Sequence, residues 1–129
     1  NNIFILLQGN SSLTLSQSSY SKFLRQGDIA IAMAGTATEE FVGLGKPAII
    51  MPGEGPQFTY AFAEAQSRLL GCSIIMVDKA NEVSQAISQV INNPQQLQQI
   101  AANGKRRMGE SGAAQRIALS LCKTLLKEQ

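Results

Sequence analysis

The sequence predicts an α/β fold in which helices cover both faces of a parallel sheet of about four strands. Short, wholly apolar runs recur along the 129 residues, as is typical of strands that are buried on both faces. Between them lie segments with apolar residues at helical spacing, several of which are followed by glycine or proline. This alternation favours a doubly wound unit with a helical C-terminus. We expect residues 1–129 to form a single, partial domain.

The expected strands are Ile3–Leu7, Asp28–Met33, Ala48–Met51 and Ser73–Val77. All are short and rich in aliphatic residues, as parallel strands are. The segment between the first two is polar and loop-like, except for a short helix that ends at Gly27.

The longest apolar stripes belong to the expected helices. Residues 36–45, "TATEEFVGLG", predict a helix that stops at Gly45. The apolar stripe of the next helix consists of Phe58, Phe62, Ala65 and Leu69. Three more helical segments follow, one over residues 83–90, one after Pro94, and one from about Gly112 to the end.

Composition and charge exclude several classes of function. The net charge is only +2 and the basic residues are spread out, apart from Lys105–Arg107, which argues against nucleic acid or an anionic membrane as the main partner. That cluster either complements a helix dipole or contacts phosphate. The chain has no histidine, so it cannot hold a Ser-His-Asp triad or a His-ligated metal of its own. We expect Cys72 and Cys122 to be reduced, buried thiols in a cytosolic protein.

The segment "GTATEE" lies where the second strand gives way to a helix. Helix N-termini bind anions, Gly35 permits close approach of a phosphate, and Thr36 and Thr38 add hydroxyl donors. Glu40, one turn further on, is placed to accept the hydroxyls of a ribose. A second interpretation is a capping box of Thr36 and Glu39, and the two interpretations are compatible.

The segment "PGEGPQ" follows the third strand at the same edge of the predicted sheet. It is interpreted either as a stiff connector or as a loop around a diphosphate or sugar. In the second case Gly53 and Gly55 lie against the ligand and Gln57 donates to it. The nearby "GLGKPA" matches a dinucleotide fingerprint, but it follows a helix and precedes a strand, which is the wrong order.

Taken together, "DIAIAMAGTATEEFVGLGKPAIIMPGEGPQFTYAFAEAQSRLLG" (residues 28–71) resembles the C-terminal, donor-binding half of GT-B glycosyltransferases. The likeness is to lipid-A-disaccharide synthase and its cyanobacterial relatives, and the tail "RRMGESGAAQRIA" is similar to the end of that group. The resemblance covers roughly residues 3–118.

The resemblance implies a Rossmann-like half-molecule that binds a UDP-sugar and serves an inverting hexosyl transfer in lipid A biosynthesis. It implies no cofactor and no protein-held metal. Glu40 would hold the uridine ribose, the turn at residues 35–38 would lie against the diphosphate, and Gln57, Phe58 and Thr59 would face the donor sugar. The candidate UDP-sugar-binding residues are therefore Gly35, Thr36, Thr38, Glu40, Gly53, Gly55, Gln57, Phe58 and Thr59. The catalytic residues are unknown.

The resemblance also implies that an N-terminal acceptor domain, a Gly-rich loop and the catalytic base lie outside this sequence. We therefore expect the chain to be inactive alone and the full-length protein to be cytoplasmic, at the inner membrane face. A missing neighbour would leave a sheet edge unpaired near Ile3–Leu7, through which the chain would form a homo-oligomer. Two other functions stay open: a UDP-sugar 2-epimerase-like enzyme, and a non-catalytic ligand- or partner-binding module built on the same fold.

Overall fold

A computed structural model describes residues 3–17 and 19–127 and contains six α-helices and five strands in that range. Three strands form a parallel sheet, β3 (Ala30–Ala32), β4 (Ala48–Ile50) and β5 (Ile74–Met76), in that order. The mixed α/β class and the parallel sheet agree with the sequence prediction.

The first two strands belong elsewhere. β1 (Ile3–Gln8) pairs with β2 (Ser11–Ser16) as an antiparallel hairpin. The prediction of a fourth buried strand in the parallel sheet at Ile3–Leu7 is thus wrong, as is the prediction of a loop after it. Gly9 at φ 58° begins a two-residue turn that sends the chain back on itself. The signal was Gly-Asn followed by alternating apolar residues.

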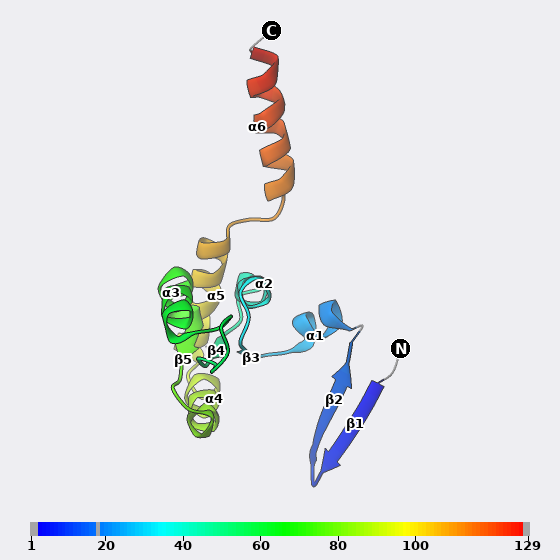
Figure 1. Cartoon of the computed structure of the whole chain (residues 1–129), viewed down its shortest axis with the longest axis vertical. Coiled ribbons are helices and arrows are strands. Elements are labelled where there is room, and N and C mark those ends of the chain that lie inside the picture. Colours follow the sequence, from blue (N-terminus) through cyan, green and yellow to red (C-terminus); the bar gives the residue numbers. More distant parts are fainter. Residues whose placement is uncertain (1–2, 18, 128–129) are drawn as a thin grey trace.

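Helices cover both faces of the parallel sheet (Figure 1). On one face α2 (Thr36–Gly43) and α3 (Tyr60–Leu70) pack over Ala48 and Ile50 of the central strand. On the other face α4 (Val83–Ile91) packs over Ile49. Successive residues of one strand thus point into two different apolar clusters.

The buried face of α3 differs from the predicted one. Phe62 and Leu69 are 43% and 56% exposed, whereas Ala63 and Leu70 are fully buried. Phe58 precedes the helix, whose N-cap is Thr59. Counting Phe58 as a helical residue shifted the predicted stripe around the helix.

Two short 3₁₀ turns, η1 (Gly71–Ser73) and η2 (Ala80–Glu82), flank β5. After α4, α5 (Pro94–Met108) packs against α2. A Cβ at Gly104 would overlap the carbonyl oxygen of Val42, so this glycine permits the close contact of the two helices.

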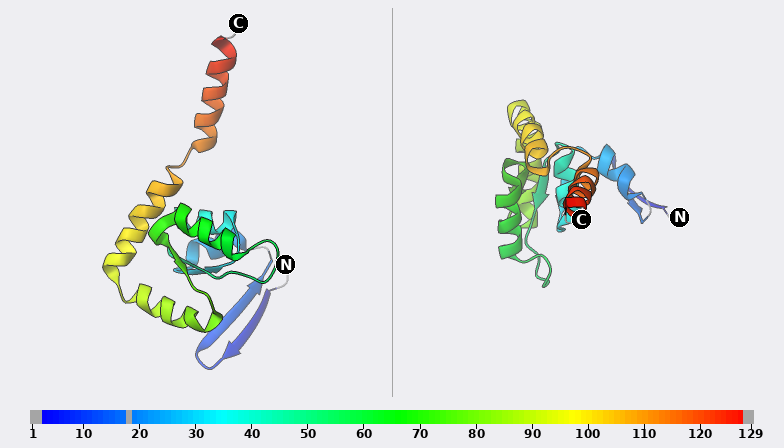
Figure 2. Two further views of the ribbon diagram at one scale, coloured as in Figure 1. Left: turned by 60° about the vertical axis from the view of Figure 1, so that its left-hand side comes forward. Right: turned by 90° about the horizontal axis from the view of Figure 1, so that it is seen from above.

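Peripheral elements extend from this body (Figures 1 and 2). The hairpin lies to one side, beyond α1 (Tyr20–Gln26), and α6 (Ala113–Lys127) continues past the end of α5. In the described part of the chain, no helix has the length and apolar character that crossing a membrane requires. Cys72 and Cys122 are free thiols, but both are exposed, so the prediction that they are buried is wrong.

Candidate functional site

The turn from β3 into α2 exposes backbone amides. Gly35 is the N-cap, and its carbonyl oxygen accepts from Thr38 N at 3.0 Å and from Glu39 N at 3.2 Å. The amides of Thr36 and Ala37 have no acceptor among the described residues. The helix start therefore keeps two donors that an anion can use.

The capping box predicted for Thr36 and Glu39 does not form, because α2 has no side-chain cap among the described residues. The helix begins one residue earlier than that motif requires, so Thr36 is already helical. The other interpretation, an anion site at the amides, does not depend on the capping box and stays a prediction.

The buried side chains of Thr38 and Gln66 hold the turn between β3 and α2 from the side that faces the core. Thr38 is 1% exposed and donates its hydroxyl to Ala34 O at 2.6 Å. Gln66, 4% exposed on α3, donates from Nε2 to Ala34 O at 3.1 Å and to Gly35 O at 3.2 Å. Both side chains bind carbonyl oxygens, which orients the opposite, N–H side of the turn away from the core. The sequence predicts that the Thr38 hydroxyl donates to a ligand, whereas in the structure it donates to the backbone.

Gln66 was missed by the sequence analysis. Its Oε1 is buried without a hydrogen-bond partner among the described residues, so the side chain is held by its amide nitrogen alone. The available signal was a glutamine three residues after Ala63 on the true buried face of α3, which the shifted stripe concealed.

The loop after β4 lies at the same edge of the sheet, because β3 and β4 are parallel neighbours. Gly53 N donates to Phe58 O at 2.8 Å, which closes the loop. Gly55 and Gln57 are exposed on it. A Cβ at Gly53 would meet the terminal methyl of Met33, so the loop and the turn after β3 are in contact.

Phe58 and Thr59 join this loop to α3. The Phe58 ring is buried and lies 5.3 Å from the Phe62 ring, centroid to centroid. The Thr59 hydroxyl accepts from Phe62 N at 3.3 Å and caps the helix. A ligand role for Phe58 and Thr59 stays a prediction. Phe58 contacts the loop through its backbone carbonyl oxygen, which accepts from Gly53 N.

Glu40 lies on the exposed side of α2, facing α1. The Tyr20 hydroxyl donates to Glu40 Oε2 at 2.7 Å. This hydrogen bond, together with the negative charge of the carboxylate, raises the pKa of Tyr20 above its ordinary value. The phenol therefore remains a donor throughout the neutral range.

Lys46 holds the other end of α1. Its Nζ donates to Arg25 O and, at 2.7 Å, to Gly27 O, and it lies 5.4 Å from the centroid of the Phe41 ring. A cation there satisfies carbonyls at a helix C-terminus. Lys46 is the lysine of "GLGKPA", the segment whose order does not fit a dinucleotide fingerprint, and its contacts give it a structural role at the end of α1.

The candidate residues thus form two neighbouring groups around the start of α2. The turn at Gly35 and the loop at residues 53–58 meet at the carboxyl edge of the sheet, and Glu40 lies toward α1. In comparisons with family models, curated proteins and solved structures, nothing matched this chain.

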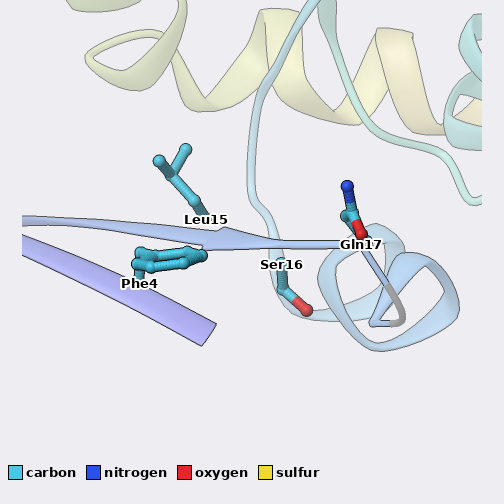
Figure 3. A pocket seen from close by; sticks show the side chains of 4 residues that line it. All are labelled: Phe4, Leu15, Ser16 and Gln17. Atoms are coloured by element: carbon cyan, nitrogen blue, oxygen red, sulfur yellow. The ribbon is translucent and has the colours of Figure 1, made fainter. Parts of the chain in front are cut away.

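Other surface features lie apart from these groups. A depression of about 460 Å³ at the base of the hairpin is lined by Phe4, Leu15, Ser16 and Gln17. Leu15 and Gln17 lie on one side of the strand and Ser16 on the other (Figure 3), which is the alternation of an exposed ribbon. The depression contains none of the predicted ligand-binding residues, so we locate the candidate site by the polar groups around α2.

The basic cluster at Lys105–Arg107 and the cysteine and carboxylate side chains add little to the candidate site. Lys105–Arg107 occupy the last turn of α5 before Gly109, as predicted for a dipole-complementing end. Arg106 Nη2 also donates to Asn103 Oδ1 at 3.3 Å. Within the described residues, cysteine and carboxylate side chains form no group of three that could hold a metal ion.

Proposed function

We propose that this chain is the UDP-sugar-binding part of an inverting glycosyltransferase similar to lipid-A-disaccharide synthase. One observation carries the proposal. Two amides at Thr36 and Ala37 have no acceptor among the described residues, and the exposed carboxylate of Glu40 lies one helical turn away. The first group suits a phosphate and the second suits the hydroxyls of a ribose.

The proposed fold is Rossmann-like and doubly wound, as part of a GT-B C-terminal half. It is supported by the parallel order of β3, β4 and β5 and by apolar clusters on both faces of the sheet. In such sheets ligands bind at the carboxyl ends of the strands, which is where Gly35 and Gly53 lie.

In this proposal each group has one task. The amides and the positive end of the α2 dipole stabilise the diphosphate, and its charge on the leaving UDP, without a protein-held metal. Glu40 fixes the ribose, and the loop at residues 53–57 faces the sugar. The acceptor, the catalytic base and a cytoplasmic location at the inner membrane face belong to the proposal for the full-length protein.

The experiment is an amide NMR titration of this chain with UDP, ADP and inorganic phosphate. We expect shifts that saturate with UDP and cluster at residues 35–40 and 53–59. Equal responses to UDP and ADP would show that the site does not select uridine. Shifts with phosphate alone would reduce the turn to a general anion site, and an unchanged spectrum with UDP would count against the proposal for this chain.

A further inference from the structure

Among the described residues, one side-chain hydrogen bond links α1 to the candidate site. Tyr20, the first residue of α1, donates its hydroxyl to Glu40 Oε2 at 2.7 Å across 20 residues of chain. At this distance an O–H···O⁻ bond is a strong, charge-assisted one. Tyr20 is otherwise half exposed, so its hydroxyl is the part of the side chain with a specific partner.

The position of Tyr20 is determined from both ends of its helix. At the C-terminus of α1, Lys46 Nζ donates to Arg25 O and Gly27 O. Lys46 lies just beyond α2, the helix that carries Glu40. The start of α1 is thus tied to Glu40 in the middle of α2, and its end is tied to Lys46 in the segment after α2, which fixes the direction from which the phenol approaches the carboxylate.

Glu40 has hydrogen-bonding capacity to spare. An ionised carboxylate offers about four lone-pair sites on its two oxygens, and the Tyr20 hydroxyl takes one of them on Oε2. No lysine or arginine of the described residues forms an ion pair with Glu40. The carboxylate therefore has no competing cation among the described residues and is restrained by a neutral donor.

We propose that Tyr20 is a positioning residue that holds the Glu40 carboxylate in the orientation in which its free lone pairs accept the hydroxyls of a ribose. The inference rests on the proposed function, because it assigns the ligand of Glu40 as a nucleoside diol. It adds a second residue, from another helix, to that site. A carboxylate on an exposed helix otherwise rotates among rotamers, and restraining it lowers the entropy lost on binding.

The test compares UDP with 2′,3′-dideoxyuridine diphosphate by isothermal titration, on the 129-residue chain. We expect Tyr20→Phe to weaken UDP binding about three- to tenfold, the effect of one hydrogen bond, and to leave the dideoxy ligand unchanged. Tyr60→Phe, on the exposed start of α3, is the matched control and should affect neither ligand. Glu40→Gln should remove most of the preference for UDP, and Tyr20→Phe should then have no further effect.

Three outcomes would overturn the inference, and they are distinguishable. If Tyr20→Phe weakens both ligands equally, the tyrosine acts elsewhere than through Glu40. If it changes neither while the wild type prefers UDP, Glu40 does not need it. If the wild type does not bind UDP or does not distinguish the two ligands, the proposed function itself fails. Circular dichroism of each variant separates these results from loss of folding.

Discussion

Gly35 is the residue at which the proposed diphosphate site can be tested most directly. Its φ is −80°, and a Cβ added there would lie 3.6 Å from Phe62 Cζ, an ordinary contact. We expect Gly35→Ala to lower the free energy of unfolding by about 1 kcal/mol, because alanine is a poorer N-cap than glycine. We also expect it to weaken UDP binding, because the added methyl group lies next to the free amides. Thermal unfolding and calorimetric titration measure the two effects.

Uridine provides the internal control for Gly35→Ala, since it has the ribose but no phosphate. Its binding should be the same in both proteins. Equal weakening of UDP and uridine would indicate a general distortion of α2, and undiminished UDP binding would place the diphosphate elsewhere.

Tyr20 offers a measurement that needs no ligand. Its pKa is raised by the hydrogen bond to Glu40 and by the carboxylate charge, so Glu40→Gln should lower it toward the ordinary value near 10. Tyrosinate absorbance followed with pH, with Tyr60→Phe used to leave Tyr20 as the single tyrosine, gives the shift. A group whose pKa is higher in the folded state stabilises the fold below its unfolded pKa. That contribution is lost as pH rises through the folded value, so the contact should persist at neutral pH. An unchanged pKa in Glu40→Gln would mean that the hydrogen bond does not form in solution.

The residues of the site were only partly predictable from the sequence. Gly35 and Glu40 are candidates from the sequence because glycine and an acid at the start of a helix have a direct physical meaning, and their ligand role stays a prediction. Gln66 and Tyr20 were not, because each acts on a partner 20 or more residues away. Such contacts depend on how the elements pack, which local spacing does not encode.

At the scale of elements, the contact of α2 with α5 depends on Gly104. A Cβ there would overlap a backbone carbonyl oxygen of α2, and backbone cannot move aside as a side-chain end can. We expect Gly104→Ala to lower the free energy of unfolding by about 1–3 kcal/mol, measured by urea denaturation. Gly43→Ala is the matched control on the facing helix, where the nearest atoms belong to the flexible Met108 side chain at 3.4 Å, and it should be tolerated. Equal stability of the two variants would contradict this account.

The elements themselves were more predictable than their pairing. The three strands of the parallel sheet follow from apolar runs, the end of α5 follows from Gly109, and the start of α6 follows from Gly112. The strand β1 was found, but its partner was not, because a wholly apolar run does not specify whether its neighbour is local or distant. The helix α3 was predicted with the wrong buried face, because Phe58, which precedes the N-cap, was taken as a helical residue.

At the scale of the whole molecule, the hairpin carries an apolar surface. β1 and β2 are exposed along almost their whole length, and the paired residues Phe4 with Leu15 and Leu6 with Leu13 place four apolar side chains on one face. We propose that the chain self-associates through this hairpin and its unpaired edges. Sedimentation velocity over a range of concentrations should show species larger than the monomer.

The double variant Leu6→Lys with Leu13→Lys should shift the chain toward the monomer, because lysines on an exposed strand oppose pairing. Thr14→Lys, on the other face of β2, is the control for added charge and should have a smaller effect. A wild type that is monomeric at every concentration would refute self-association by this route.

The attachment of α1 has a consequence for partial unfolding. The helix fully buries none of its seven residues. Leu24 packs against the core only partly buried, and polar contacts from Lys46 and to Glu40 hold the two ends of the helix in place. Segments with little buried apolar surface open at a lower free energy than the core, so α1 should detach while the parallel sheet stays folded. Any ligand that binds better when Tyr20 is in place must then, by thermodynamic reciprocity, slow proteolytic cleavage within residues 20–27.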